Sequence, residues 1–237
     1  MPWMPTDSNL NFMADVHQAY EGLMDCAPGL EEPGLGGQLL YVGELNEPGS
    51  ALTIASNIAG GATLATSAEP AALRQALREG VIDFLVNSLD EALRILKNEI
   101  RKGEPVAVAV SLAPETIEAE MIDRGVLPNL LPRGCSTSAQ SSAPALFLSQ
   151  GAREVPLPNQ AAGKFLIWAA PAEYAQNLAG FESIFADHLA ITDRLNRRWL
   201  RLSPRYLGPG ARRLRSIACD GDTATTLVKL LGPPLNA

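Results

Sequence analysis

The stretch VIDFLVNSLDEALRILKNEIRKGEPVAVAV, residues 81–110, contains two apolar runs separated by a helical pattern. The first run, residues 81–86, and the last, residues 105–110, are short, rich in valine and almost continuous in hydrophobicity, as strands buried on both faces are. Between them, Ser88 is followed three residues later by Glu91, a capping box that marks the start of a helix. We therefore predict a strand, a helix and a second, parallel strand in this stretch.

The same alternation continues on both sides of this stretch. Short apolar runs predict further strands, and the segments between them carry helical periodicity with glycine at their ends. The expected strands are residues 38–42, 62–66, 129–131 and 165–170, and the expected helices are residues 51–59, 69–79, 88–102 and 114–124. This order predicts an α/β protein with a doubly wound, mostly parallel, Rossmann-like sheet that is covered by helices on both faces.

Helical extensions are expected at both ends of the chain. A weakly amphipathic helix at residues 11–25 is followed by a loop rich in proline and glycine at residues 27–37. We take this loop as the boundary between an N-terminal helix and linker, residues 1–37, and a single Rossmann-like domain with an arginine-rich helical extension, residues 38–237. The C-terminal part is expected to contain helices at residues 171–180 and 181–202, an edge strand at residues 213–218 and a closing helix after Asp220.

Composition and charge limit the classes of partner. The chain has 237 residues, of which 46% are hydrophobic, and a net charge of −7, so it can build a substantial core. Residues 194–215 include eight arginines and no acidic residue, which leaves 11 basic against 26 acidic residues elsewhere, a balance of −15. An acidic body argues against nucleic acid as a partner.

The chain shows no targeting or membrane segment. Its start, MPWMPTDSNL, lacks the layout of a secretory signal, and no apolar run reaches the ~18 residues that a membrane helix needs. Three scattered cysteines favour reduced thiols over a disulfide framework, so we expect a cytoplasmic protein. The two histidines, His17 and His188, fall on expected helices, where a place on a helix face is favoured over proton transfer. Neither a metal site nor a catalytic residue is predicted.

Four segments between residues 41 and 140 occur in the order and spacing of a known domain: YVGEL, ALTIASNIAGGATLA, VIDFLVNSLDEALRILKNEIRKGEPVAVAV and EAEMIDRGVLPNLLPRGCSTSA. Together they resemble the central, NAD-binding domain of urocanase (urocanate hydratase). The resemblance implies a lyase of histidine catabolism, in which NAD⁺ bonds to the substrate imidazole as an electrophile before water adds to the ring. Members of that family are more than twice as long, and their other domains supply catalytic groups.

The resemblance places cofactor-binding residues after the first two strands and in the loop after the fifth. These are Gly43, Glu44, Gly49, Ser50, Ser67, Thr137 and Ser138. Where the family has a glycine-rich loop whose amides lie against the dinucleotide phosphates, this chain has ELNEPGS, with Glu44 and Glu47 beside the phosphate positions. The later loop GCSTSAQ has Gln140 in place of the family's histidine. We therefore expect weak NAD binding or none, and no hydration of urocanate by this chain alone.

The arginine-rich segment has two interpretations. Arg194, Arg198 and Arg201 are spaced by four and three residues, which places them on one face of the expected helix. Guanidinium groups on such a face can hold a carboxylate or another anion in bidentate pairs. Alternatively, these arginines meet acidic groups of the protein's own body.

Two hypotheses about function remain open. In the first, the chain is a urocanase-like protein that binds a nucleotide or a small anionic or imidazole-like metabolite. In the second, it has lost NAD and serves as a binding or assembly module. The helix at residues 181–202 would then lie at the contact of a homo-oligomer.

Overall fold

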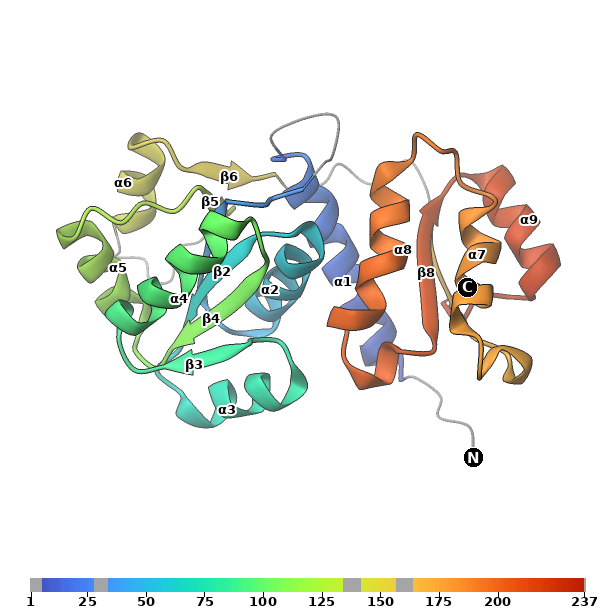
Figure 1. Ribbon diagram of the computed structural model, residues 1–237, viewed down its shortest axis with the longest axis horizontal. Helices are drawn as coiled ribbons and strands as arrows, with labels where there is room; N and C mark the ends of the chain where they lie inside the picture. Colours follow the sequence, from blue (N-terminus) through green and yellow to red (C-terminus); the bar gives the residue numbers. More distant parts are fainter. Residues whose placement is uncertain (1–5, 28–33, 134–141, 157–163, 237) are drawn as a thin grey trace. The chain divides into compact units, whose positions relative to one another are not determined.

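Contacts between residues divide the chain into two compact units, Val16–Leu157 and a second unit made of Met1–Asp15 with Pro158–Ala237. The computed structural model describes residues 6–27, 34–133, 142–156 and 164–236 (Figure 1). The division differs from the single domain at residues 38–237 that we expect from the sequence. The physical reason is strand pairing, because the last two strands bond to each other and not to the parallel sheet.

Within the described residues, the first unit contains a six-stranded parallel sheet in the order β3-β4-β2-β1-β5-β6. Its strands are β1 (Leu39–Glu44), β2 (Ala62–Thr66), β3 (Phe84–Val86), β4 (Val106–Val110), β5 (Leu130–Pro132) and β6 (Arg153–Val155). Its helices are α2 (Glu47–Ala59), α3 (Pro70–Glu79), α4 (Leu89–Lys102), α5 (Pro114–Asp123) and α6 (Ala143–Ser149). Helix α1 (Asp7–Met24) belongs to this unit from Val16 onward and to the second unit up to Asp15. The prediction of a doubly wound, Rossmann-like sheet is confirmed.

Helix α4 begins at the capping box predicted from the sequence. The Ser88 side chain accepts a hydrogen bond from the Glu91 amide at 3.3 Å, and the Glu91 carboxylate accepts one from the Asn87 amide at 3.0 Å. Gly103 ends the helix in the left-handed conformation, with φ of 73°, which costs glycine little. The strand before the helix is shorter than the expected residues 81–86, since only Phe84–Val86 pairs with β4.

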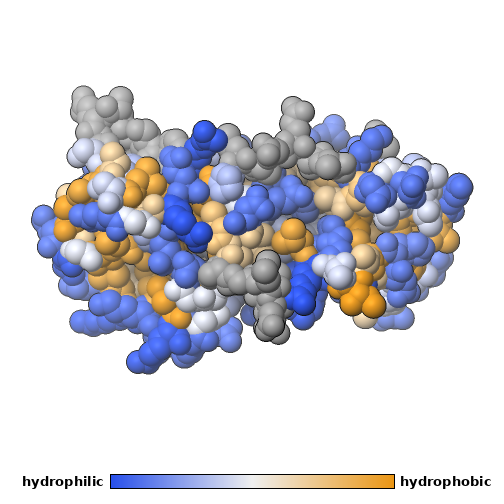
Figure 2. All heavy atoms as spheres, turned by 90° about the horizontal axis from the view of Figure 1, so that it is seen from above, coloured by the Kyte–Doolittle hydropathy of each residue, from blue (hydrophilic) through white to orange (hydrophobic). Residues whose placement is uncertain are grey.

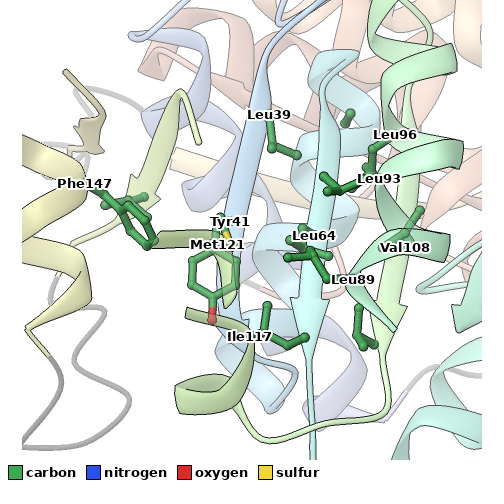
Figure 3. Packing of buried hydrophobic residues seen from close by; sticks show 14 of the residues in the cluster. Leu39, Tyr41, Leu64, Leu89, Leu93, Leu96, Val108, Ile117, Met121 and Phe147 are labelled. Atoms are coloured by element: carbon green, nitrogen blue, oxygen red, sulfur yellow. The ribbon is translucent and has the colours of Figure 1, made fainter. Parts of the chain in front are cut away.

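One face of the sheet packs against α4, α5 and α6 (Figure 3). The strands contribute Leu39, Tyr41, Leu64 and Val108, and the helices contribute Leu89, Leu93, Leu96, Ile117, Met121 and Phe147. Each leucine or valine side chain removed from water contributes about 1.5–3 kcal/mol. These contacts therefore hold three helices on this face.

The opposite face of the sheet is lined by small side chains. Side chains alternate along a strand, so the neighbours of the residues above point the other way. They include Thr63, Ala65, Ala107 and Ala109, all fully buried. Helix α2 contacts β1, β2 and β4. Small residues allow this helix to approach the strands closely, and both faces of the sheet are covered as predicted.

The second unit is built on two antiparallel strands, β7 (Lys164–Ala169) and β8 (Leu214–Cys219). Its helices are α7 (Leu178–Ala186), α8 (Arg194–Tyr206) and α9 (Gly221–Leu231), with short 3₁₀ turns at Ala172–Tyr174 and Pro209–Ala211. The core is aromatic, since Trp168, Phe181 and Phe185 are buried together. The predicted strand at residues 213–218 and the closing helix are both present, and Asp220 caps that helix by accepting from the Thr223 amide at 2.8 Å.

The predictions of helices at residues 171–180 and 181–202 are wrong. The chain instead forms a 3₁₀ turn, helix α7, a break at residues 187–193 and helix α8. Apolar periodicity runs through the break, which is why the sequence predicts one long helix there.

Two polar side chains produce the break between α7 and α8. Asp193 caps α8 by accepting a hydrogen bond from the Asn196 amide at 3.1 Å. The Arg197 guanidinium donates to three carbonyl oxygens at and beyond the end of α7, at 2.9, 2.7 and 3.0 Å, those of Ala186, Leu189 and Ala190. A cation at a helix C-terminus satisfies carbonyls that have no partner within the helix.

The described helices include none that is both long and apolar enough to cross a membrane. Figure 2 shows hydrophilic residues over much of the face it draws, with hydrophobic residues between them.

Burial of His17 predicts an acid-sensitive fold. Burial lowers the pKa of His17 to about 3, and its Nδ1 lies 3.9 Å from a Glu21 carboxylate oxygen. Between an unfolded pKa of 6.5 and a folded pKa of about 3 the unfolded chain binds the extra proton, so stability falls as pH falls through this window. At pH 5 the cost is about 2 kcal/mol. Urea unfolding at pH 7.5 and pH 5 should show this loss in the wild type and a smaller one in His17→Gln. Equal losses in both proteins would contradict the prediction.

Candidate functional site

The candidate site lies where β1 ends and α2 begins. In a doubly wound sheet, ligands bind outside the carboxyl ends of the strands, at the point where the strand order reverses. Here β1 has β2 on one side and β5 on the other. The register of β1 shifts between Tyr41 and Gly43, and Gly43 has a φ of 77°, a conformation that favours glycine. Glu44, which is half-buried, follows this bulge as the last residue of β1.

Helix α2 is capped by its own side chains. It begins at Glu47, four residues before the expected start. Asn46 is the N-cap, and its side-chain oxygen accepts from the Gly49 amide at 3.0 Å. The Ser50 amide donates to the Asn46 carbonyl at 2.8 Å, and Pro48 has no N–H. In the first turn of α2, the Gly49 and Ser50 amides are therefore already bonded, and residue 48 offers no N–H to an anion.

Gly49 is required for packing. A Cβ atom at this position would lie 2.4 Å from the Glu44 carbonyl oxygen and 3.1 Å from Cγ1 of Val42. The first turn of α2 thus rests directly on the end of β1. Glycine here permits close contact between helix and strand, which is one of the roles of glycine in Rossmann-like turns.

Thr66, the last residue of β2, and Ser67, which follows it, also form hydrogen bonds within the protein. Thr66 donates from its hydroxyl to the Gly43 carbonyl at 3.0 Å, which joins the ends of β1 and β2. Ser67 is buried, its amide donates to the Val110 carbonyl at 3.2 Å, and its hydroxyl accepts from the Glu69 amide at 3.2 Å. The Ser67 side chain therefore organises the turn before α3.

These contacts do not fit a dinucleotide bound at α2. A pyrophosphate there would meet a helix terminus whose Gly49 amide is already used, beside the carboxylates of Glu44 and Glu47. Among the described residues, three buried polar atoms have no hydrogen-bond partner: Ser56 Oγ, Asn57 Oδ1 and Thr63 Oγ1. They belong to the last half of α2 and the start of β2, away from the carboxyl edge where phosphates would bind.

The structure brings together only part of the predicted set. Gly43, Glu44, Gly49 and Ser50 lie at the junction of β1 and α2, and Ser67 follows the neighbouring strand β2. Thr137 and Ser138 lie outside the described residues. Arg194, Arg198 and Arg201 all belong to α8 in the other unit, where Arg194 and Arg201 are exposed and Arg198 is half-buried.

A buried polar pair was missed by the sequence analysis. The Tyr41 hydroxyl donates to a Glu118 carboxylate oxygen at 3.2 Å, and both residues are almost fully buried. The Tyr41 ring contacts the ring of Phe147 edge to face. Figure 3 shows Tyr41 among Ile117, Met121 and Phe147. The sequence feature that could have indicated this pair is Glu118, an acidic residue between the apolar residues Ile117 and Met121 on the buried side of α5.

The described residues indicate neither a nucleophilic cysteine nor a metal site. Burial, with a smaller effect of Asp220, raises the pKa of Cys219 to about 11, and burial also raises the pKa of Cys26. Thiols of this kind are poor nucleophiles at neutral pH. In the described ranges, no group of three or more His, Cys, Asp or Glu residues is placed to hold a metal ion.

The packing of Gly49 gives a direct test of this geometry. Gly49→Ala should destabilise the fold by roughly 1–3 kcal/mol, because the new methyl group collides with backbone at the end of β1. The matched control is Gly221→Ala in the first turn of α9, where a Cβ meets nothing within 4 Å. Thermal unfolding should show a lower Tm for the first variant alone. Equal Tm values would mean that α2 does not rest on β1.

A comparison with protein families agrees with the fold. The model of the urocanase Rossmann-like domain matches residues 16–148, which is more than half of the chain. The matched segment contains the junction of β1 and α2 and the pair of Tyr41 with Glu118. The chain belongs to the urocanase family through this Rossmann-like domain.

Proposed function

We propose that this chain is a urocanase-family protein that acts as a binding or assembly module and does not hold NAD at α2. The observation that carries the proposal is the capped terminus of α2, where Asn46 occupies the Gly49 amide and Pro48 offers no N–H. Glu44 and Glu47 add negative charge at the same place. Without a bound dinucleotide, the chain alone does not hydrate urocanate. We further propose that the module is cytoplasmic and forms a homo-oligomer.

A second candidate function is supported by the pair of Tyr41 and Glu118. Ligand sites combine apolar walls with a few polar groups that orient the ligand. Tyr41 and Glu118 are a phenol and a carboxylate of this kind, but both are almost fully buried and bonded to each other, so a ligand would reach them only after this part of the core opens. A small ligand with N–H donors, such as an imidazole, would suit them. If the second candidate is correct, the wild type binds imidazole compounds, and Tyr41→Phe and Glu118→Gln abolish this binding. The first candidate predicts no such loss.

We expect the wild type to show no NAD binding by calorimetry and no NAD in the mass spectrum of the denatured purified protein. A triple variant, Asn46→Gly with Glu47→Gln and Pro48→Ala, should gain at least ~10-fold in NAD affinity, about 1.4 kcal/mol. It frees the Gly49 amide, adds an amide at residue 48 and removes a negative charge.

Glu104→Gln is the matched control for charge. It also removes one negative charge, but Glu104 precedes β4 and so lies at the amino edge of the sheet. Its NAD binding should equal that of the wild type. Micromolar NAD affinity in the wild type, or hydration of urocanate followed by its ultraviolet absorbance, would overturn the proposed function.

We also propose that α8 binds small anions through Arg194 and Arg201, which are exposed, and Arg198, which is half-buried. Arg201→Ala should leave Tm nearly unchanged and weaken binding of inorganic phosphate or a dicarboxylate. The control is Arg197→Ala, which removes three hydrogen bonds to carbonyls at and beyond the end of α7 and should lower Tm by several degrees. Calorimetric titration and thermal unfolding measure both effects. A clear fall in Tm for Arg201→Ala without a change in anion binding would show a structural role.

A further inference from the structure

Asp220 and Gly221 join strand β8 to helix α9 in the second unit. Of the 20 glycines in the sequence, Gly221 alone follows an aspartate, and none follows an asparagine. Both residues are exposed. Among aspartyl sequences, aspartate before glycine rearranges most readily, because glycine has no side chain to hinder attack by its amide nitrogen on the neighbouring carboxyl group. The junction therefore has a chemical property that no other glycine of the chain shares.

Neither backbone conformation nor packing requires glycine at position 221. Gly221 is not among the glycines with a positive φ, and a Cβ atom there would meet nothing within 4 Å among the described residues. Glycine also weakens a helical turn relative to alanine. The fold therefore does not explain this glycine, and alanine can replace it without a collision.

The Asp220 carboxylate caps α9 and is held away from the Gly221 nitrogen. It accepts from the Thr223 amide at 2.8 Å, with the Asp220 backbone at a ψ of 172°. Ring closure requires instead that the carboxyl carbon turn toward the nitrogen of the next residue. Hydrogen bonds from Thr223 also lower the pKa of Asp220, and an ionised carboxylate is a poorer target for attack than the neutral acid. The capped turn therefore opposes the rearrangement.

The helix side of this junction opens more readily than the strand side. Cys219 is buried and pairs with Lys164 across the β7–β8 ladder. Asp222, in the first turn of α9, is exposed. Helix ends open locally at a lower cost than paired, buried strands do. Opening of this turn releases the Asp220 carboxyl group beside the Gly221 nitrogen.

We propose that Asp220 and Gly221 form a modification site at which the backbone rearranges to isoaspartate when the first turn of α9 opens. The Gly221 nitrogen bonds to the side-chain carboxyl carbon of Asp220, and one carboxyl oxygen leaves as water with the amide hydrogen and the acid proton. Water then adds to the succinimide ring. Cleavage between the nitrogen and the main-chain carbonyl carbon gives isoaspartate, and cleavage of the new bond returns aspartate. The water lost in the first step is regained in the second, so the mass of the chain is unchanged.

The product cannot cap α9 as Asp220 does. In isoaspartate the main chain runs through the former side chain, and the free carboxylate is attached to the α-carbon. The N-cap hydrogen bond stabilises the helix start and is lost with this change. Ala224 and Leu227 of α9 are buried in the core that contains Trp168. The modification therefore weakens the attachment of α9 to its unit.

Incubation of the full chain at neutral pH, followed by trypsin, tests the site. The peptide of residues 216–229 contains Asp220 and, as an internal control, Asp222, which precedes Thr223. Electron-transfer fragmentation locates isoaspartate, and an isoaspartate-specific carboxyl methyltransferase measures its amount. Isoaspartate should accumulate at residue 220, more slowly in the native chain than in guanidinium chloride, and Gly221→Ala should reduce it to the level at residue 222. Equal amounts at residues 220 and 222 of the wild type, or none at 220 in the native chain, would overturn the proposal.

Two variants of Thr223 test whether opening of the turn sets the rate. Thr223→Gly and Thr223→Ala both keep the capping amide and lose the same hydroxyl, but they differ in helix propensity. The native glycine variant should form isoaspartate about five-fold faster than the alanine variant, the ratio that corresponds to ~1 kcal/mol. In guanidinium chloride the two should react equally, because no helical turn remains. Equal rates in the two native variants would overturn the dependence on opening.

Discussion

Parallel pairing is the constraint on which the first unit depends. A chain that leaves one strand cannot enter a parallel neighbour through a tight turn, so a helix must cross a face of the sheet between them. Strand β4 lies between β2 and β3, parallel to both, and is buried along its whole length. Helices consequently cover both faces. All the strands end at one edge, and the reversal of order beside β1 creates the position where related folds bind ligands.

The same position shows how a fold can persist while its site changes. The packing of α2 on β1 through Gly49 preserves the geometry of a Rossmann-like turn. The Asn46 side chain, however, satisfies the helix terminus that a phosphate would otherwise satisfy. Helix capping and anion binding use the same amides, so a local stabilising contact competes directly with the cofactor. Function therefore has to be argued from these side chains and not from the fold.

In the second unit, backbone groups at the outer edges of the two strands are hydrogen-bonded by side chains and a backbone amide. Its sheet has only two described strands, so each has one outer edge. The Asn236 side chain and the Leu235 amide bond to the outer edge of β7, and the Asn196 side chain bonds to both backbone groups of Ala218 in β8. Side-chain amides can imitate a neighbouring strand because they carry a donor and an acceptor. In the described part of this unit, these side chains and the Leu235 amide thus take up backbone groups at Phe165, Ile167 and Ala218 that face away from the partner strand.

Local signals in the sequence determined the elements of the Rossmann-like unit. The capping box of Ser88 and Glu91, the glycine that ends α4 and the valine-rich β4 act within a few residues, so they can be recognised without the fold. The resemblance to urocanase also followed from sequence and agrees with the family match. The resemblance also predicted that Gly43 and Glu44 lie at the end of β1, followed by Gly49, which the structure places in the first turn of α2.

Only the tertiary structure decided which strands pair and what each polar group contacts. Strand β7 is as apolar as a parallel strand, and its antiparallel pairing with β8 depends on residues about fifty positions away. The break before α8 depends on Arg197 reaching the end of α7, and the Tyr41–Glu118 pair joins residues far apart in the chain. Periodicity reports which face of an element is apolar. It carries no information about the partner of that face, because the partner is chosen by packing of the whole chain.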